Sequence, residues 1–276
     1  MAELTADIPS SLRTALDREV ARIKGTRSSV ITAALADYLG TPVHTLFQIS
    51  TSGALVAGID SGVVRVQGVL KHGDFGLGTF ADLNGEMVVV DGRVYRVEGT
   101  GLVSEAPLDA AAPFAIVTRF SPDVDAIIQA IASIRDLEVH CDARRASENI
   151  FYALRLDGRF SHVRARAVSK AAEGARLVDA ARAQSEFHFT DVVGTLVGIW
   201  SPGFSSAFSV PGYHFHFLSE DRQRGGHLLD CAAGTLRLKM EALTDFHLAL
   251  PETESFLKAD LSKNATDELA YAEKAH

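Results

Sequence analysis

Three histidines in the last third of the chain have the types and spacing of metal ligands. Residues 212–217 read Gly-Tyr-His-Phe-His-Phe. Side chains alternate along a strand, so His214 and His216 would face the same side, with Cα atoms about 7 Å apart. Two imidazoles at that separation can bind one ion. A third histidine, His227, follows a Gly-Gly pair at the start of a second apolar stretch.

A polar connection predicts how the third histidine reaches the first two. The segment Ser219–Arg224 is strongly polar, so we expect it to loop outward between Tyr213–Leu218 and His227–Cys231. These two stretches then form an antiparallel hairpin, which brings His227 beside His216. Three neutral imidazoles on one sheet face are typical of a catalytic zinc site, where a fourth position stays available for water or substrate. Other divalent metals that accept imidazole fit the same pattern.

The remaining histidines and cysteines fit this site less well. Cys231 lies roughly 13 Å along the strand from His227, which is too far to share its ion. The histidines His72, His188 and His247 are isolated in the sequence, and we expect them to be structural.

The glycine-rich segment Lys71–Phe80 has three glycines in six residues. Glycine lets a backbone approach a ligand or another strand closely. The segment lacks the Gly-Lys-Ser/Thr of a phosphate loop and opens no obvious helix. We therefore expect a strand that passes near a site rather than a nucleotide site.

The elements that must position these residues are mostly strands. After the first forty residues, apolar side chains alternate with period two in many short stretches, and Asp91-Gly92 predicts a tight hairpin turn. Ser-Pro-Asp starts a helical pattern, which predicts a helix over Ser121–Leu137. In the second half, the strand-like stretch Phe151–Leu156 is followed by Asp157-Gly158. Trp200 and the phenylalanines are expected in the core.

The two halves of the strand-rich region resemble each other weakly. Gln67–Leu70 corresponds to Val193–Leu196, and Asn84–Val90 corresponds to Pro211–Phe217, with similar intervals between them. This spacing suggests a duplicated sheet unit. We expect the active site to lie where the two sheets meet.

The first forty residues have a different pattern. An alternating stretch over residues 4–8 precedes a helix that starts after Pro9 and runs to Ile23, and a second helical pattern covers Val30–Leu39. This order resembles a ribbon-helix-helix segment. The predicted fold class is therefore α+β: two sheet-based units with mixed or antiparallel strands over 43–150 and 151–276, plus a strand-helix-helix appendage over 1–42.

Charge argues against a nucleic-acid partner for this appendage. In the ribbon-helix-helix family the strand pairs with its twin and its outward side chains read DNA. Those side chains would be Glu3, Thr5 and Asp7 here, and the two acids would repel phosphates. The whole chain has 27 Lys+Arg against 35 Asp+Glu, a formal charge of −8. We expect the appendage to dimerise or pack, in a homo-oligomer that is a dimer or larger.

Composition indicates a globular protein of the cytoplasm. The 276 residues are 47% hydrophobic, which is enough for a core, and no apolar run approaches the roughly 18 residues of a membrane span. The N-terminus has no cationic region followed by a long apolar stretch, so we expect no signal peptide. The two cysteines are too few for a disulfide framework, which favours a reducing compartment.

Six motifs spread over the chain share one resemblance. They are Lys-His-Gly-Asp-Phe-Gly-Leu-Gly-Thr-Phe (71–80), Leu-Asn-Gly-Glu (83–86), Val-Asp-Gly-Arg-Val-Tyr-Arg-Val (90–97), Gly-Thr-Leu-Val-Gly (194–198), Gly-Tyr-His-Phe-His-Phe (212–217) and Gly-Gly-His (225–227). In order and spacing they resemble the acetolactate decarboxylase family, from about Val43 to the C-terminal region. Residues 1–40 and the loop 201–210 depart from the family pattern.

This resemblance implies an enzyme that converts 2-acetolactate to acetoin and carbon dioxide, with Zn²⁺ held by His214, His216 and His227. The substrate has a carboxylate, a tertiary hydroxyl and an adjacent ketone. Loss of carbon dioxide leaves an enediolate, whose charge a Lewis acid stabilises. No organic cofactor is needed, because the substrate's own ketone accepts the electrons.

The resemblance also implies three charged catalytic residues. Glu86 matches the glutamate that follows the Asn-Gly turn. Arg166 best matches an arginine of a later strand, with Arg164 as the alternative register. Glu273 matches a glutamate of the C-terminal tail, with Glu268 as a rival. Arg166 would hold the substrate carboxylate in a forked pair, and Glu86 or Glu273 would return a proton to carbon.

Two other functions stay open at this point. A zinc hydrolase would use the same three histidines to activate water, although the sequence lacks His-Glu-x-x-His. A metal-binding regulator would use the N-terminal segment to bind DNA. Acetoin release without amide or ester cleavage separates the decarboxylase from the hydrolase, and tight operator binding without decarboxylation would identify the regulator.

Overall fold

The computed structural model describes residues 5–40, 43–169 and 184–262. Contacts between Cα atoms divide the chain into two compact units, Met1–Val43 and His44–His276. The predicted catalytic Glu273, its rival Glu268 and the outward-facing Glu3 of the predicted ribbon lie outside the described residues.

The N-terminal unit contains the two predicted helices. Helix α1 spans Ser10–Ile23 and helix α2 spans Arg27–Leu39. The break between them has a reciprocal cap: the Thr26 hydroxyl accepts a hydrogen bond from the Ser29 N–H, and the Ser29 hydroxyl accepts one from the Thr26 N–H. Because this cap satisfies the Ser29 N–H in the first turn of α2, it favours the start of a new helix here over an extension of α1.

The predicted N-terminal strand is absent from the described residues 5–9, which form neither helix nor strand. A strand needs a pairing partner, and no described segment of the same chain pairs with them. Neither helix buries a residue. Large apolar side chains of both helices are exposed: Leu12, Ile23, Ile31, Leu35, Tyr38 and Leu39.

The second unit contains a seven-stranded sheet in the order β14-β1-β8-β3-β4-β5-β6. Neighbouring strands are antiparallel except for the parallel pair β1 and β14. The predicted turn Asp91-Gly92 joins β4 to β5, with φ angles of 52° and 73°. The strands are β1 (Thr45–Ile49), β3 (Phe75–Thr79), β4 (Glu86–Val90), β5 (Arg93–Val97), β6 (Val103–Glu105), β8 (Phe114–Thr118) and β14 (Asp245–Ala249).

Longer strands form a five-stranded sheet in the order β10-β11-β12-β13-β9. Strand β10 also pairs with β13, so β10, β11, β12 and β13 form a closed ring of pairings. The strands are β9 (Val124–Ile131), β10 (Phe151–Ala167), β11 (Ser185–Ser201), β12 (Gly212–Ser219) and β13 (Gly225–Leu243).

Short elements complete this unit. The helices are α3 (Ser52–Val56), α4 (Val66–His72), α5 (Ile134–Asp142) and α7 (Glu254–Lys258), with single turns η1 (Ala81–Leu83) and η2 (Gly203–Ala207). Strands β2 (Val64–Arg65) and β7 (Ala111–Ala112) pair with each other. None of the described helices is long and apolar enough to span a bilayer.

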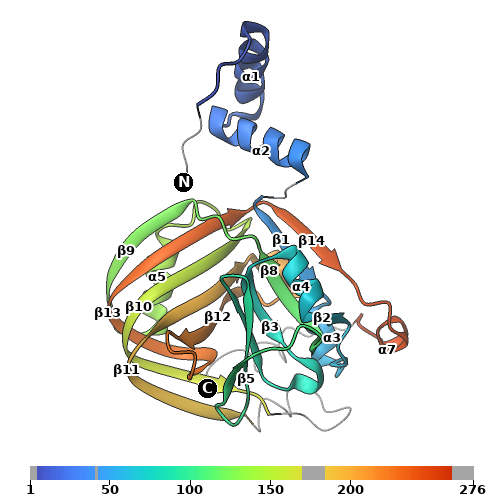
Figure 1. The fold of residues 1–276 in the computed structure, drawn as a ribbon, viewed down its shortest axis with the longest axis vertical. Helices are drawn as coiled ribbons and strands as arrows, with labels where there is room; N and C mark the ends of the chain where they lie inside the picture. The colour runs from blue at the N-terminus through green and yellow to red at the C-terminus, as the bar shows by residue number, and fades with distance from the viewer. Residues whose placement is uncertain (1–4, 41–42, 170–183, 263–276) are drawn as a thin grey trace. The chain divides into compact units, whose positions relative to one another are not determined.

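The two large sheets share a core. One buried cluster takes residues such as Leu77 and Val88 from the first sheet and Val197 and Ile199 from the second. A second cluster lies on the other face of the long strands and includes Trp200, as predicted for this residue, and α5. Figure 1 shows the long strands β9, β10, β11 and β13 as a curved sheet. Hydrophobic burial in the first cluster therefore fixes the second sheet against the first, and the second cluster packs α5 on the long strands.

The predicted helix over Ser121–Leu137 is wrong. Strand β9 occupies its centre, and α5 begins near its end. The apolar spacing suggested a helix because Ile128 and Ile131, three residues apart, are both buried. Ala130 has a φ of 60°, and this local kink lets both isoleucines face the core from one strand that pairs with β13.

Two strands cross the predicted boundary at residue 150. Strand β9 joins the second sheet, although it belongs to 43–150, and β14 joins the first sheet, although it belongs to 151–276. Each covers a strand that would otherwise be exposed at a sheet edge, β9 on β13 and β14 on β1. Edge protection, rather than sequence proximity, therefore explains their placement.

The predicted similarity of the two halves holds only in part. Asn84–Val90 and Pro211–Phe217 both enter a strand through a glycine of positive φ, at 96° and 87°. However, Gln67–Leu70 lies on α4, whereas Val193–Leu196 lies in β11. The second pair of segments is therefore not structurally equivalent.

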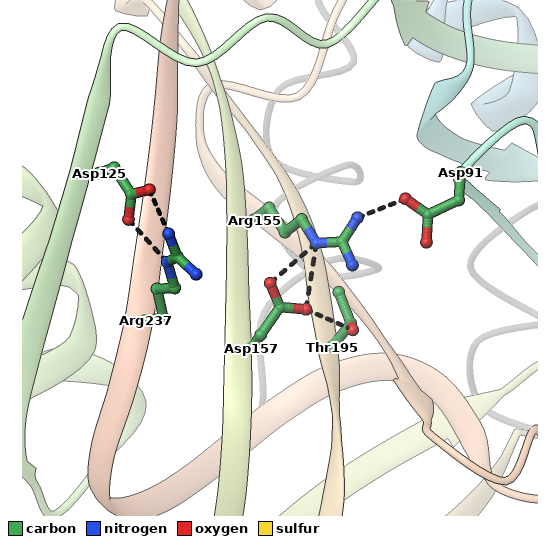
Figure 2. A network of polar contacts seen from close by, with 6 residues as sticks. All are labelled: Asp91, Asp125, Arg155, Asp157, Thr195 and Arg237. Atoms are coloured by element: carbon green, nitrogen blue, oxygen red, sulfur yellow. Dashed lines mark hydrogen bonds and ion pairs between the residues drawn. The ribbon is translucent and has the colours of Figure 1, made fainter. Parts of the chain in front are cut away.

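A polar network joins the two sheets where the sequence has Asp157-Gly158. Both residues lie inside β10. The Arg155 Nε donates to the Asp157 carboxylate at 2.8 Å, and the Thr195 hydroxyl of β11 donates to the same carboxylate at 2.7 Å (Figure 2). Arg155 also donates to Asp91, in the turn between β4 and β5, at 2.6 Å. These bonds stabilise the extended conformation of β10 and connect it to the first sheet.

Candidate active site

The predicted histidine hairpin is present in the structure. Strands β12 and β13 are antiparallel, and His216 is directly opposite His227. On the other side of β12, His214 is opposite Ile199 of β11. Because Ile199 belongs to the core between the sheets, the histidine face of β12 is the face that looks toward the first sheet.

The three imidazoles converge on one point. One ring nitrogen from each of His214, His216 and His227 lies within 4.8 Å of the other two. The Nε2 atoms of His214 and His216 are 3.2 Å apart. Two nitrogens bound to a tetrahedral zinc at about 2.05 Å would be about 3.3 Å apart. The donor set and its spacing therefore fit zinc.

The tautomer of His216 and the burial of His214 suit metal binding. The Nδ1 of His216 is 2.8 Å from the Met87 carbonyl oxygen, so Nδ1–H donates there and Nε2 keeps its lone pair. Burial, together with the positive charge of Arg166, lowers the pKa of His214 to about 3. The His214 imidazole is therefore neutral near pH 7, which is the form that binds metals.

Glu86 reaches the same site from the first sheet. The Glu86 Oε2 lies 3.6 Å from the His216 Nε2, and Glu86 is only 9% exposed. The preceding Gly85 has a φ of 96°, and a Cβ there would lie 2.5 Å from the Val97 carbonyl oxygen. Only glycine fits this position, so the Asn-Gly pair before Glu86 lets β4 start beside β5 and point Glu86 at the histidines.

Arg166 reaches the site from β10. It is buried and is opposite His227 in the register of β10 and β13. A bulge between Arg164 and Ala165 separates the two candidate arginines. Arg164 is partly exposed and lies 3.9 Å from the Glu186 carboxylate. Arg166 is thus beside the histidines, whereas Arg164 is opposite Asp230, further along β13.

The other ligand candidates lie elsewhere. His72 stacks on Phe47 with ring centroids 3.6 Å apart, and His188 and His247 are exposed on β11 and β14. Burial raises the pKa of the Cys231 thiol to about 12, so it is protonated. Among the described residues, the group formed by His214, His216 and His227 is the one whose ligand atoms could hold a metal.

Sequence reasoning missed the Met87 carbonyl. A backbone oxygen has no side-chain signal, and Met87 becomes relevant only because β4 packs against β12. The glycine-rich segment Lys71–Phe80 is, as predicted, a strand rather than a phosphate loop: it forms the end of α4 and then β3, next to β4 in the first sheet.

Comparison with known proteins agrees with this geometry. The family model described as alpha-acetolactate decarboxylase matches residues 46–263. An alpha-acetolactate decarboxylase of Methanosarcina mazei is 39% identical over 230 residues, which are 83% of this chain and 80% of that protein. One of Brevibacillus brevis is 35% identical, over 84% of this chain and 82% of that protein. The crystal structure of the Bacillus subtilis strain 168 enzyme superposes with a TM-score of 0.81 at 32% identity, over 84% of this chain and all of that one. The chain therefore belongs to the alpha-acetolactate decarboxylase family.

Proposed function

We propose that this protein decarboxylates 2-acetolactate to acetoin and carbon dioxide, with Zn²⁺ bound by His214, His216 and His227. The observation that carries the proposal is the convergence of three imidazole nitrogens within 4.8 Å in a chain of this family. Bound there, zinc would supply a Lewis acid for the negative charge that develops as carbon dioxide leaves. Family membership favours this reaction over zinc-dependent hydrolysis and over a regulatory role.

The protein's own residues bind the substrate and move its proton. Arg166 is buried and positively charged, so its planar guanidinium suits a substrate carboxylate that has left water. Glu86, 3.6 Å from the His216 ring, is near enough to give a proton to the reacting carbon after the carboxylate is lost. Glu273 stays a proposed second proton carrier, and its position lies outside the described residues.

The test is product formation from racemic 2-acetolactate, measured as acetoin and carbon dioxide. We expect both products in equal amounts from the purified protein, loss of activity after a strong chelator removes the metal, and recovery with added Zn²⁺. Recovery of activity with another divalent ion but not with Zn²⁺ would show that the protein uses that ion instead of zinc. Cleavage of ester or amide substrates without acetoin formation would support the hydrolase instead.

We also propose that the protein is a homo-oligomer in the cytoplasm and that the N-terminal unit contributes to assembly. Both of its helices leave their apolar side chains uncovered, and a second copy would cover them. Deletion of residues 1–40 should lower the mass in light scattering or the melting temperature, with zinc binding and acetoin formation retained. Cys141 and Cys231 are both free and buried.

A further inference from the structure

Strand β12, which carries two of the three histidines, has neighbouring strands on both sides over only part of its length. All of Gly212–Ser219 pairs with β11, but only His216–Leu218 pairs with β13. His214 therefore lies on a segment with one strand partner among the described residues. The position of its imidazole depends on what else holds this segment.

Arg145, just beyond the end of α5, binds the residue next to His214. Its Nε donates to the Tyr213 hydroxyl at 3.1 Å, and its Nη2 donates to the Asp142 carboxylate at 2.5 Å. The guanidinium carbon lies 3.7 Å from the centre of the Trp200 ring. The Arg145 side chain is only 7% exposed, so its guanidinium is shielded from water, whereas the Asp142 side chain is 50% exposed.

The Tyr213 hydroxyl closes this cluster by donating to Asp142 at 2.6 Å. Tyr213 is also opposite Trp200 in the pairing of β11 and β12, one position from His214. Arg145, Asp142, Tyr213 and Trp200 therefore form one connected clamp on the start of β12.

Helix α5 connects the clamp to β13. At its start, the Ile134 N–H donates to the Asp230 carboxylate of β13 at 2.8 Å. Leu137 in its middle and Cys141 near its end are buried in the core of the second sheet. The helix is thus anchored on β13 at one end and on β12, through the clamp, at the other. It provides a second connection between these strands where they do not pair.

We propose that Arg145 is a positioning residue for the metal site: its clamp on Trp200 and Tyr213 fixes the start of β12 so that His214 completes the three-histidine group. Side chains of neighbouring strand residues point to opposite faces, so Arg145 acts from the face opposite the metal and touches no substrate. A displacement of Tyr213 moves His214 with it, and metal ligands must be held within about 0.5 Å. This inference rests on the proposed zinc site.

The test compares zinc affinity among folded variants by competition with a chromophoric chelator, well below their melting temperatures. Arg145→Lys keeps the charge but loses the planar stack and the fork, and we expect at least a tenfold weaker zinc affinity, about 1.4 kcal/mol. Tyr213→Phe keeps the ring but loses the hydroxyl, and we expect a smaller loss in the same direction. Should Arg145→Lys not fold, Tyr213→Phe decides the question.

The matched control is Arg237→Lys. Arg237 also forms a two-pronged pair with a carboxylate, that of Asp125, but between β13 and β9 (Figure 2). No aromatic ring of the described residues stacks on it. We expect the zinc affinity of the Arg237→Lys protein to stay within twofold of that of the unmodified protein. Folded Arg145→Lys and Tyr213→Phe proteins that bind zinc as tightly as this control would overturn the positioning role. An unmodified protein that binds no zinc would instead overturn the proposed function.

Discussion

Replacing Gly226 with alanine perturbs the contact that holds His227 beside Arg166. Gly226 has a φ of 139°, and a Cβ there would lie 2.5 Å from the Arg166 carbonyl oxygen, against about 3.4 Å for ordinary contact. Strand β13 would have to move by about 0.9 Å away from β10. A displacement near 1 Å at a catalytic site costs on the order of 100-fold in kcat/KM.

The same substitution should also destabilise the fold. A non-glycine residue in this backbone conformation costs about 2 kcal/mol, which in a unit of this size corresponds to a melting temperature lower by roughly 4–8 °C. Circular dichroism measures the melting temperature, and zinc content and acetoin formation are measured at 25 °C on the folded protein.

Gly234→Ala is the matched control, because Gly234 lies on the same strand and a Cβ there meets nothing within 4 Å. We expect a change of at most about 2 °C in its melting temperature and kcat/KM within twofold of the unmodified protein. If Gly226→Ala keeps the zinc content and kcat/KM of Gly234→Ala, the close approach of β13 to Arg166 does not matter for the site, and the reasoning is wrong.

Three further predictions test other parts of the structure. Arg166→Lys should lower kcat/KM by on the order of 100-fold with zinc retained, whereas Arg164→Lys should keep kcat/KM within about threefold of the unmodified protein. If steady-state kinetics gave the opposite ranking, Arg164 and not Arg166 would be the substrate-binding arginine. The Glu241 carboxylate, 3.3 Å from the His44 Nδ1, raises the pKa of His44, so their pairing stabilises the fold below the ordinary His pKa near 6.5 and is lost as pH rises through the raised value. The melting temperature of His44→Gln should therefore fall furthest below the unmodified protein at pH 6 and approach it above pH 8, and a constant difference would contradict the pairing. Arg155→Met should lower the melting temperature by about 1–4 °C because it removes the ionic link between the sheets, and no change would show that the link is screened by water.

The histidine hairpin could be predicted because its signals are local. Alternation over Tyr213–Leu218 and a polar loop of six residues determine which side chains share a face, and the pairing of His216 with His227 follows. Local hydrophobic patterning also predicted helices α1 and α2, since their caps and breaks are encoded by neighbouring residues.

The rest of the site depends on contacts that spacing does not encode. Glu86 and the Met87 carbonyl come from the first sheet, and packing between sheets brings them to His216. Glu86 was identified by family resemblance alone, and Met87 contributes only a backbone atom. Arg145 belongs to no motif, and its role follows from the ending of strand pairing beside His214.

Strand β9 was not predicted from the sequence for a different reason. Its isoleucines have helical spacing, and the kink at Ala130 that reconciles this spacing with a strand is a response to pairing with β13. Tertiary contacts therefore override the local pattern here.

Whether the three histidines hold the catalytic zinc is tested by zinc content and acetoin formation, measured on the same preparations of the unmodified protein, His216→Ala and His188→Ala. Two imidazoles make a poor site, so His216→Ala should lose bound zinc and decarboxylation together. His188 is exposed on β11, and its replacement should leave equimolar zinc and full activity. Equimolar zinc with normal acetoin formation in His216→Ala would contradict the three-histidine site.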